Sequence, residues 1–358
     1  MKKLRFVIDP RYWVVFVVAV SMLISCKQNA KQSINTTKSP SVAKDTIHTN
    51  EETPLSNEIV DNAHGKDDFS LFELSNLEDG GDTLMLVSVS DVDTLSRDIN
   101  PNVIPDQAGK RPDQSRRFKL TSGYRKRLLK STGISESDSL FIYDYANDLI
   151  TAFSISSLNA VATLSPYADT PDEKHDEIDY MLGFQIEPAS NPKIDYFNTT
   201  KLSICISHTN PFARGQMKPV IWSKADAKSF PKVSFREADK KVLKGYVLSG
   251  TYTFQSNDHH FNLQTYTKDG ESIEHIIILN DAKKIVYQNL FYEQESSSPA
   301  TLSFINGKQN PLEQWTGTLF KNKPPVILGF EYANFGCAVI PYIDGSNHYT
   351  VLNCDNRH

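Results

Sequence analysis

The sequence predicts an α+β fold that is rich in β-structure. Short apolar runs of strand length recur along the chain from Phe69 onward, and turn residues separate them. The aromatic residues are weighted toward strand formers, with 15 Tyr and 19 Phe against 3 Trp. Helix signals are few, so we expect one or two short helices in the N-terminal half and strands elsewhere.

The first elements alternate between strand and loop signals. Residues 84–90 (LMLVSVS) form a strand-like run, and the polar stretch 91–117 is typical of a long loop. A helix follows, in which Ser122 is placed to cap residues 123–132 and Gly133 to end them. Further strand candidates are 139–145, 149–155, 158–164, 180–187 and 201–207, the first two joined by a hairpin at Asn147-Asp148.

The C-terminal half predicts an antiparallel meander. Asp269-Gly270 stands between two strand-like runs and favours a type I′ hairpin. Asn280-Asp281 predicts the next turn, so we expect a curved sheet or a barrel. The pairs that the first turn predicts are Phe261 with Ile278 and Leu263 with Ile276.

Composition divides the chain into four stretches. Residues 1–25 form a predicted signal peptide, and residues 26–66 form a polar tether that contains few large apolar side chains. Residues 67–235 form a β-rich α+β region, and residues 236–358 form the antiparallel β meander. A helix is predicted over 235–243, but no linker composition marks a boundary there. The last two stretches are therefore also compatible with one domain.

The N-terminus carries an export signal. Four basic residues precede an apolar run over 12–24 that only Ser21 interrupts. This run is shorter than the roughly 20 residues of a membrane-spanning helix and has the length of a signal-peptide core. It ends in Leu23-Ile24-Ser25-Cys26, which resembles the lipobox of bacterial lipoproteins. The resemblance covers residues 1–26 only, and it implies cleavage before Cys26 and acylation of this cysteine.

The same resemblance implies a membrane partner, held through the lipid on Cys26. Lys27 and Gln28 stand where an aspartate would resemble an inner-membrane retention signal, so we expect the outer membrane. No acidic cluster follows the cysteine, which favours the periplasmic face. Exposure at the cell surface is the alternative.

Three cysteines remain besides the acylated one. A two-residue turn at Gly345-Ser346 would place Cys337 opposite Cys354 in a hairpin. The side chains of such a pair are close enough for a disulfide, and the periplasm is oxidising enough to form it. We expect a Cys337–Cys354 disulfide and a buried free thiol at Cys205, with two unlinked buried cysteines as the alternative to the disulfide.

The densest group of charged side chains lies over 169–179 (DTPDEKHDEID). Hard cations such as Ca²⁺ prefer about six to eight oxygen ligands, which an acidic loop can supply. The spacing lacks the regular acids and the sharp-turn glycine of a calcium loop, so the simpler alternative is a solvated loop between strands. The candidate residues for a cation-binding or partner-binding loop are Asp172, Glu173, His175, Asp176, Glu177 and Asp179.

Other chemistry-bearing residues form no recognised pattern. Asp258-His259-His260 would need a bend to bind one metal ion, because adjacent side chains of a strand point to opposite faces. His275 is expected on the same face as His260. We predict no metal and no cofactor, and Cys205 in an apolar strand is a poor nucleophile because burial raises a thiol pKa.

Several carboxylates near strand ends offer candidates for the acid pair of a glycoside hydrolase. They are Asp144, Asp148, Asp179, Glu187 and Glu331. Nothing in the sequence singles out a pair, and the nucleophile elbow, P-loop and zinc-protease motifs are all missing.

The charge of the chain limits the classes of partner that we expect. The net charge of −5 gives no general attraction to nucleic acid. Residues 111–130 are locally basic and could touch anionic lipid or glycan, with a solvated surface as the alternative.

We therefore expect a non-catalytic cell-envelope lipoprotein that binds a ligand, an envelope protein or a glycan, or that supports an envelope assembly. One alternative is an envelope hydrolase that acts on glycan through a carboxylate pair. A second alternative is an inhibitor or immunity-type lipoprotein.

The lipobox makes a direct prediction about Cys26. Cells that express the chain and are fed labelled palmitate should incorporate the label into the wild type and not into a Cys26→Ala variant, because only the thiol accepts the diacylglycerol group. Gel fluorography of the purified proteins measures this. Equal labelling of the two proteins would contradict acylation at Cys26.

Overall fold

A computed structural model describes residues 69–79, 82–90, 104–106, 116–168, 175, 177–187, 191–303, 305, 313–334 and 336–355. All of them belong to one compact unit, Asn62–His358. The predicted signal peptide, Cys26 and the predicted tether lie outside the described residues. No helix in the described ranges is long and apolar enough to cross a membrane.

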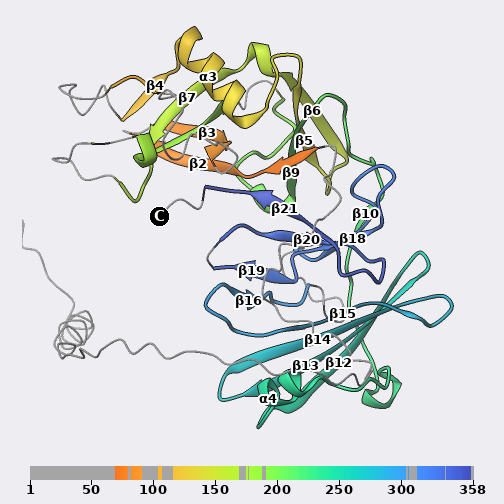
Figure 1. Ribbon diagram of the computed structural model, residues 1–358. Coiled ribbons are helices and arrows are strands. Elements are labelled where there is room, and N and C mark those ends of the chain that lie inside the picture. Colours follow the sequence, from red (N-terminus) through yellow and green to blue (C-terminus); the bar gives the residue numbers. More distant parts are fainter. Residues whose placement is uncertain are drawn as a thin grey trace, which may run out of the picture. The chain divides into compact units, whose positions relative to one another are not determined.

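Two sheets are built mainly from N-terminal strands (Figure 1). The first has the order β20 (Val339–Pro341), β21 (Tyr349–Asn353), β1 (Ser70–Phe72), β9 (Leu202–Ser207), β5 (Ser139–Asp144) and β6 (Leu149–Ser154). The second has the order β2 (Leu74–Asp79), β3 (Asp82–Ser88), β8 (Tyr180–Ile186), β7 (Asn159–Leu164) and β4 (Arg117–Lys119).

The six-stranded sheet is buried on both faces. Leu140 and Ile142 of β5 join the core shared with the second sheet. Phe141 and Tyr143, which alternate with them, join a separate core on the opposite face. A strand that is covered on both sides needs apolar residues at successive positions, and this explains the unbroken run in β5.

The N-terminal helix is confirmed with a shifted start. Helix α3 covers Ser122–Thr132, and Gly133 ends it with a φ of 70° as predicted. The capping position belongs to Thr121 and not to Ser122, since the backbone N–H of Arg125 donates to the Thr121 carbonyl at 2.8 Å. The second predicted helix is present as α4 (Glu237–Val242). Single 3₁₀ turns lie at Ile155–Ser157, Glu177–Asp179, Thr199–Lys201 and Ala227–Ser229.

The predicted meander is confirmed up to Phe291, as an open sheet in the order β11 (Ser223–Lys224), β12 (Val247–Ser256), β13 (His259–Lys268), β14 (Glu271–Asn280) and β15 (Ile285–Phe291). Its predicted extension to residue 358 is wrong, because the later strands pair in other sheets. Asp269 and Gly270 adopt positive φ values of 52° and 95°, as a type I′ turn requires. Consequently Phe261 pairs with Ile278 and Leu263 with Ile276, in the predicted register.

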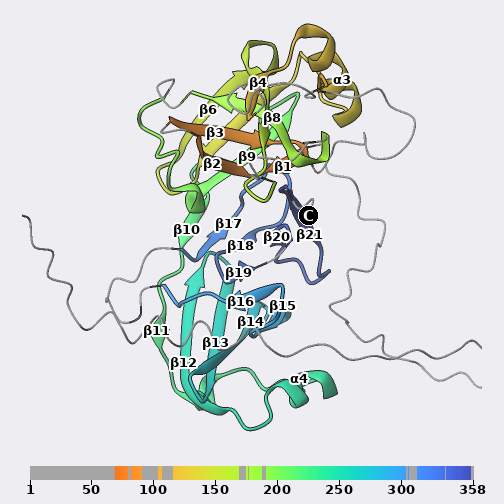
Figure 2. The same ribbon diagram turned by 90° about the vertical axis from the view of Figure 1, so that its left-hand side faces the viewer.

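Two small sheets complete the described part. One consists of β10 (Met217–Pro219), β17 (Trp315–Gly317) and β18 (Val326–Leu328), and the other of β16 (Ser297–Pro299) and β19 (Glu331–Ala333). Strand β18 faces two cores, since Val326 packs in the core that holds Tyr143 and Ile327 packs in the core beneath the meander. Figure 2 shows β18 between the strands of the six-stranded sheet and those of the meander.

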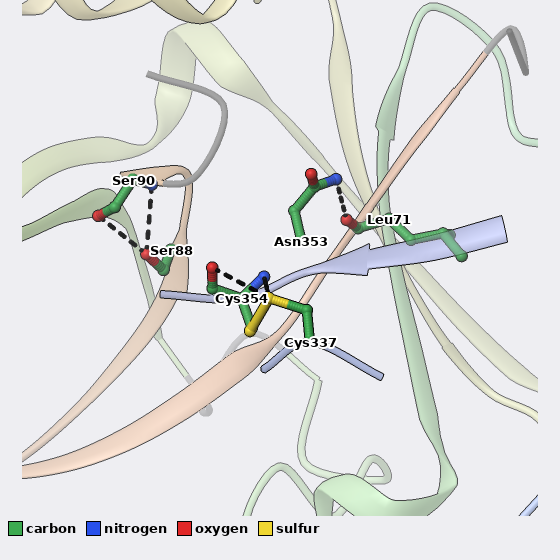
Figure 3. Close-up of a disulfide and its surroundings, with 6 residues drawn as sticks. All are labelled: Leu71, Ser88, Ser90, Cys337, Asn353 and Cys354. Atoms are coloured by element: carbon green, nitrogen blue, oxygen red, sulfur yellow. Dashed lines mark hydrogen bonds between the residues drawn. A yellow bond between two sulfur atoms is a disulfide. The ribbon is translucent and has the colours of Figure 1, made fainter. Parts of the chain in front are cut away.

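The C-terminal strand closes the six-stranded sheet. Strand β21 runs parallel to β1, with Leu352 beside Leu71. The side-chain amide of Asn353 donates to the Leu71 carbonyl at 2.6 Å (Figure 3). The predicted disulfide is present between Cys337 and Cys354, whose Cα atoms lie 5.4 Å apart, and Cys205 is a buried free thiol.

The predicted turn of this hairpin is wrong. Val339 pairs with Val351, one residue off the register that a two-residue turn at Gly345-Ser346 would give. The loop is wider because other strands hold it: the N–H of Gly345 donates to the Val286 carbonyl at 2.7 Å, and the N–H of Ile343 donates to Pro325 at 2.7 Å. The disulfide forms beyond the last strand pair and does not depend on that register.

The disulfide should stabilise the fold measurably. It closes a loop with a sequence separation of 17, and a loop of this size restricts the unfolded chain by about 3 kcal/mol. A Cys337→Ala, Cys354→Ala double variant should lose about that much unfolding free energy in urea titrations. Reductant should lower the wild type to the same level and leave the double variant unchanged. A wild type that is insensitive to reductant would contradict the role of this bond.

Candidate functional site

The meander sheet has one face in a large apolar core and one face that is partly polar. Residues paired across neighbouring strands share a face. Pairing places Thr251 of β12 beside Gln264 of β13, Gln264 beside His275 of β14, and His275 beside Leu290 of β15. All four side chains are buried. We call Thr251, Gln264 and His275 the polar row.

Residues 225–246 cover this face, and we call them the covering segment; α4 lies within it, beside the sheet in Figure 1. The rings of Phe230 and Phe235 pack on the His275 imidazole, with centroid distances of 5.3 and 4.7 Å. The covering segment is tied to the sheet at one end, where the N–H of Ala225 donates to the Thr251 carbonyl at 2.8 Å. His275 is thereby reduced to 1% exposure.

Burial makes His275 an uncharged group. It lowers the pKa of His275 to about 4, against the weaker opposing influence of the nearby Asp239 carboxylate. Asp239 is itself engaged by the Arg236 guanidinium, at 2.8 and 2.9 Å. The imidazole therefore stays neutral at physiological pH.

The polar row keeps hydrogen-bonding capacity that the described residues do not use. Nε2 of His275 lies 3.2 Å from the side-chain nitrogen of Gln288, which suits a tautomer with the proton on Nδ1. Nδ1 of His275 and Oγ1 of Thr251 are buried and have no partner in the described part of the chain. Gln264 accepts a hydrogen bond from the Tyr266 hydroxyl at 2.7 Å. Buried polar groups normally have partners, and this row contributes two of the exceptions among the described residues.

The chemistry of the row is that of recognition. Its hydroxyl, amide and neutral imidazole groups can donate and accept hydrogen bonds, and two phenylalanine rings offer apolar faces beside them. None of these groups carries charge at neutral pH. Such a set suits an uncharged polar ligand with an apolar side.

Glu274 precedes His275 and points to the opposite face of the sheet. Burial raises the pKa of Glu274 to about 8, and no neighbouring charge contributes to the shift. One of its oxygens, Oε2, is buried without a partner among the described residues. No carboxylate among the described residues contributes to this shift, so they give Glu274 no partner for the acid pair of a glycoside hydrolase.

The histidines singled out in the sequence do not come together. His259 contacts Asp258 at 2.9 Å and His260 contacts Asp281 at 3.3 Å. His260 shares a face with His275, as expected, but it pairs with Leu279, four residues along β14. That separation is about 13 Å. No group of three metal-ligating side chains occurs within the described ranges.

Most of the acidic candidate loop lies outside the described residues. This applies to Asp172, Glu173 and Asp176, and of Glu177 only the backbone is described. His175 lies 4.0 Å from Asp179. The loop as a cation or partner site stays a prediction.

Other candidate groups have local structural roles. Asp144 accepts hydrogen bonds from the N–H groups of Ala146 and Asn147 within its own turn. Asp148 accepts from Gly215 N–H at 2.8 Å and from the Tyr143 hydroxyl at 3.0 Å. Burial raises the pKa of the Cys205 thiol to about 12, so it is a poor nucleophile as expected.

Sequence reasoning missed the polar row and Glu274. One signal was available: the apolar run 276–279 has no alternation, which indicates a strand covered on both faces. In such a strand the preceding Glu274 and His275 would both be buried. Thr251, Gln264 and Phe235 gave no comparable signal, because their roles depend on strand order and on the covering segment.

The chain matches no protein-family model, no curated protein and no solved structure. Its function is therefore inferred from its own residues.

Glu274 and His275 should shape the pH dependence of stability in opposite directions. The pKa of Glu274 rises from 4.5 unfolded to about 8 folded, so stability is lost as pH rises through this range. The pKa of His275 falls from 6.5 to about 4, so stability is gained as pH rises from 4 to 6.5. The two contributions offset each other below pH 6.5, and a net loss of about 1.4 kcal/mol per pH unit remains between pH 6.5 and 8.

Glu274→Gln isolates this effect. In urea titrations at several pH values, the variant should lack the fall above pH 6.5 and should be more stable than the wild type at pH 8. Identical pH profiles for the two proteins would show that Glu274 is not buried as an acid.

Proposed function

We propose that this chain is a lipid-anchored protein of the bacterial cell envelope whose globular part binds an uncharged polar ligand without catalysis. The observation that carries the binding role is the polar row, which is buried, uncharged and only partly hydrogen-bonded. The proposed anchor is the acylated Cys26, and the proposed location is the outer membrane, facing the periplasm.

The N-terminal sequence supports the anchor. A basic segment, an apolar run of signal-peptide length and a lipobox-like end precede Cys26. The Cys337–Cys354 disulfide supports an exported protein independently, because such bonds persist in oxidising compartments.

The state of the titratable groups supports a non-catalytic role. General acid–base catalysis works best with a group whose pKa lies near the operating pH. His275 has its pKa lowered to about 4. The pKa of Glu274 lies nearer neutrality, at about 8, but this side chain is on the other face of the sheet, beside an apolar core, and no acid of the described residues shifts its pKa.

A saccharide is the ligand class that fits the row best. Sugars present hydroxyl groups, which suit Thr251, Gln264 and the Nδ1–H of His275, and an apolar face, which suits Phe230 and Phe235. The covering segment would have to shift to admit the ligand. Most of its side chains over residues 226–238 are exposed, and Phe230 and Phe235 make its ring contacts with His275.

Calorimetric titration of the mature chain with glucose, galactose, mannose and N-acetylglucosamine tests this role. At least one sugar should bind saturably. Gln264→Leu should weaken that binding about tenfold, because the loss of one or two hydrogen bonds costs about 1.4 kcal/mol. Gln255→Leu is the matched control, since Gln255 is an exposed glutamine on the same sheet.

Absence of saturable binding to all four sugars would contradict the proposed ligand class. Equal weakening by Gln264→Leu and Gln255→Leu would contradict the assignment of the site to the polar row. Turnover of a glycan, measured as released reducing ends, would favour a hydrolase instead.

A further inference from the structure

Strand β4 and helix α3 carry a concentration of positive charge. All seven charged side chains in the fifteen residues from Arg116 to Lys130 are basic, whereas the whole chain has a net charge of −5. We call six members of this set the cationic surface. Four of them are exposed, Lys119, Lys126, Arg127 and Lys130, and two are half-buried, Arg116 and Arg117.

The fold fixes the direction of these side chains. Leu128 and Leu129 bury one side of α3, so Lys126, Arg127 and Lys130 point outward along the other. Strand β4 is an edge strand of its sheet, and α3 follows it after two residues. Figures 1 and 2 both show β4 and α3 side by side.

The seventh basic residue, Arg125, is used inside the fold. Its guanidinium binds both oxygens of Glu136 at 2.7 Å and donates to the carbonyls of Leu158 and Ile155 at 2.6 and 2.5 Å. Arg125 therefore fastens α3 to the segment before β7. This role is structural. Arg125 also pairs with Glu136, which is the first acidic residue after the basic run.

The lysines of the cationic surface are not used in this way. Lys119, Lys126 and Lys130 are exposed, and no ion pair joins them to an acidic side chain within the part of the chain that the structure describes. Arg127 is exposed and stacks on the Tyr124 ring at 4.9 Å. The positive charges lie on a helix side and a strand edge, which suits an extended anionic surface.

We propose that the cationic surface docks on anionic lipid headgroups of the membrane that holds the chain. This rests on the proposed lipid anchor. The 43 steps from Cys26 to Phe69 span at most about 150 Å, so an acylated chain confines the globular part to a layer of about that depth at a bilayer. Each basic side chain near an anionic bilayer strengthens binding about fivefold. Docking would turn one face of the globular part toward the membrane.

Hydrogen exchange on the acylated mature chain tests the proposal. The protein is reconstituted into vesicles of phosphatidylcholine alone and into vesicles with about one third phosphatidylglycerol. On the anionic vesicles at low salt, backbone amides of Arg117–Thr132 should exchange at least twofold more slowly than on the neutral ones. Added salt should remove the difference, since it screens charge over about 10 Å at 0.1 M and about 3 Å at 1 M.

Two triple variants provide the matched comparison. Lys119→Gln, Lys126→Gln, Lys130→Gln should abolish the protection. Lys240→Gln, Lys241→Gln, Lys244→Gln removes three exposed lysines near α4 and should leave it unchanged. Equal exchange on the two kinds of vesicle, protection that survives the first triple variant, or protection by a soluble anionic polysaccharide but not by vesicles would each overturn the proposal.

Flotation of the same vesicles at high salt distinguishes a failure of the docking proposal from a failure of the proposed lipid anchor. If the chain floats with the vesicles but the amides of α3 are not protected, the chain is anchored and the docking proposal is contradicted. A chain that does not float refutes the anchor, and its α3 amides still report whether anionic vesicles bind the cationic surface at low salt.

Discussion

The parallel pairing of β21 with β1 joins the last described strand to the first. Leu352 lies beside Leu71, and the Asn353 side chain reaches back to the Leu71 carbonyl. A parallel pair between the ends of a chain closes a very long loop, so it gains little from local sequence and must be held by tertiary contacts. The disulfide at Cys354 supplies one such constraint directly after the strand.

The pairing of β21 with β1 places the C-terminal hairpin, β20 and β21, beside a buried core. Strand β20 pairs with β21, and its Ile340 enters the core that contains Trp315 and Tyr143. Strand β18 then shares that core through Val326 and the core of the meander through Ile327. The six-stranded sheet and the meander are therefore linked through buried side chains, and burial of this kind is the main stabilising term in folding.

The features predicted correctly from the sequence are local ones. The Asp269-Gly270 turn set the register of β13 and β14, because its backbone conformation is encoded in two residues. The Gly345-Ser346 turn failed because Val286 and Pro325, distant in sequence, bind the loop. The helix cap moved by one residue, from Ser122 to Thr121, since both can precede a helix.

The candidate site was less predictable than the fold. His275 was visible as a histidine in a strand, but its partners come from three other elements. Its pairing with Gln264 follows from the hairpin register, whereas its contacts with Phe230 and Phe235 depend on how the covering segment folds over the sheet. No spacing rule links those residues, so only the structure could assemble them.

The protein places its charge and its candidate binding groups in different regions. The polar row is uncharged, and the cationic surface lies on another sheet. We propose the polar row as a buried, neutral recognition site. The most direct measurement is an NMR titration of the His275 imidazole in the wild type. We expect a neutral ring down to about pH 4, and ring resonances that shift when a sugar that binds is added at pH 7. A pKa near 6.5, together with no response to any sugar, would show a solvent-accessible histidine and contradict a buried recognition site.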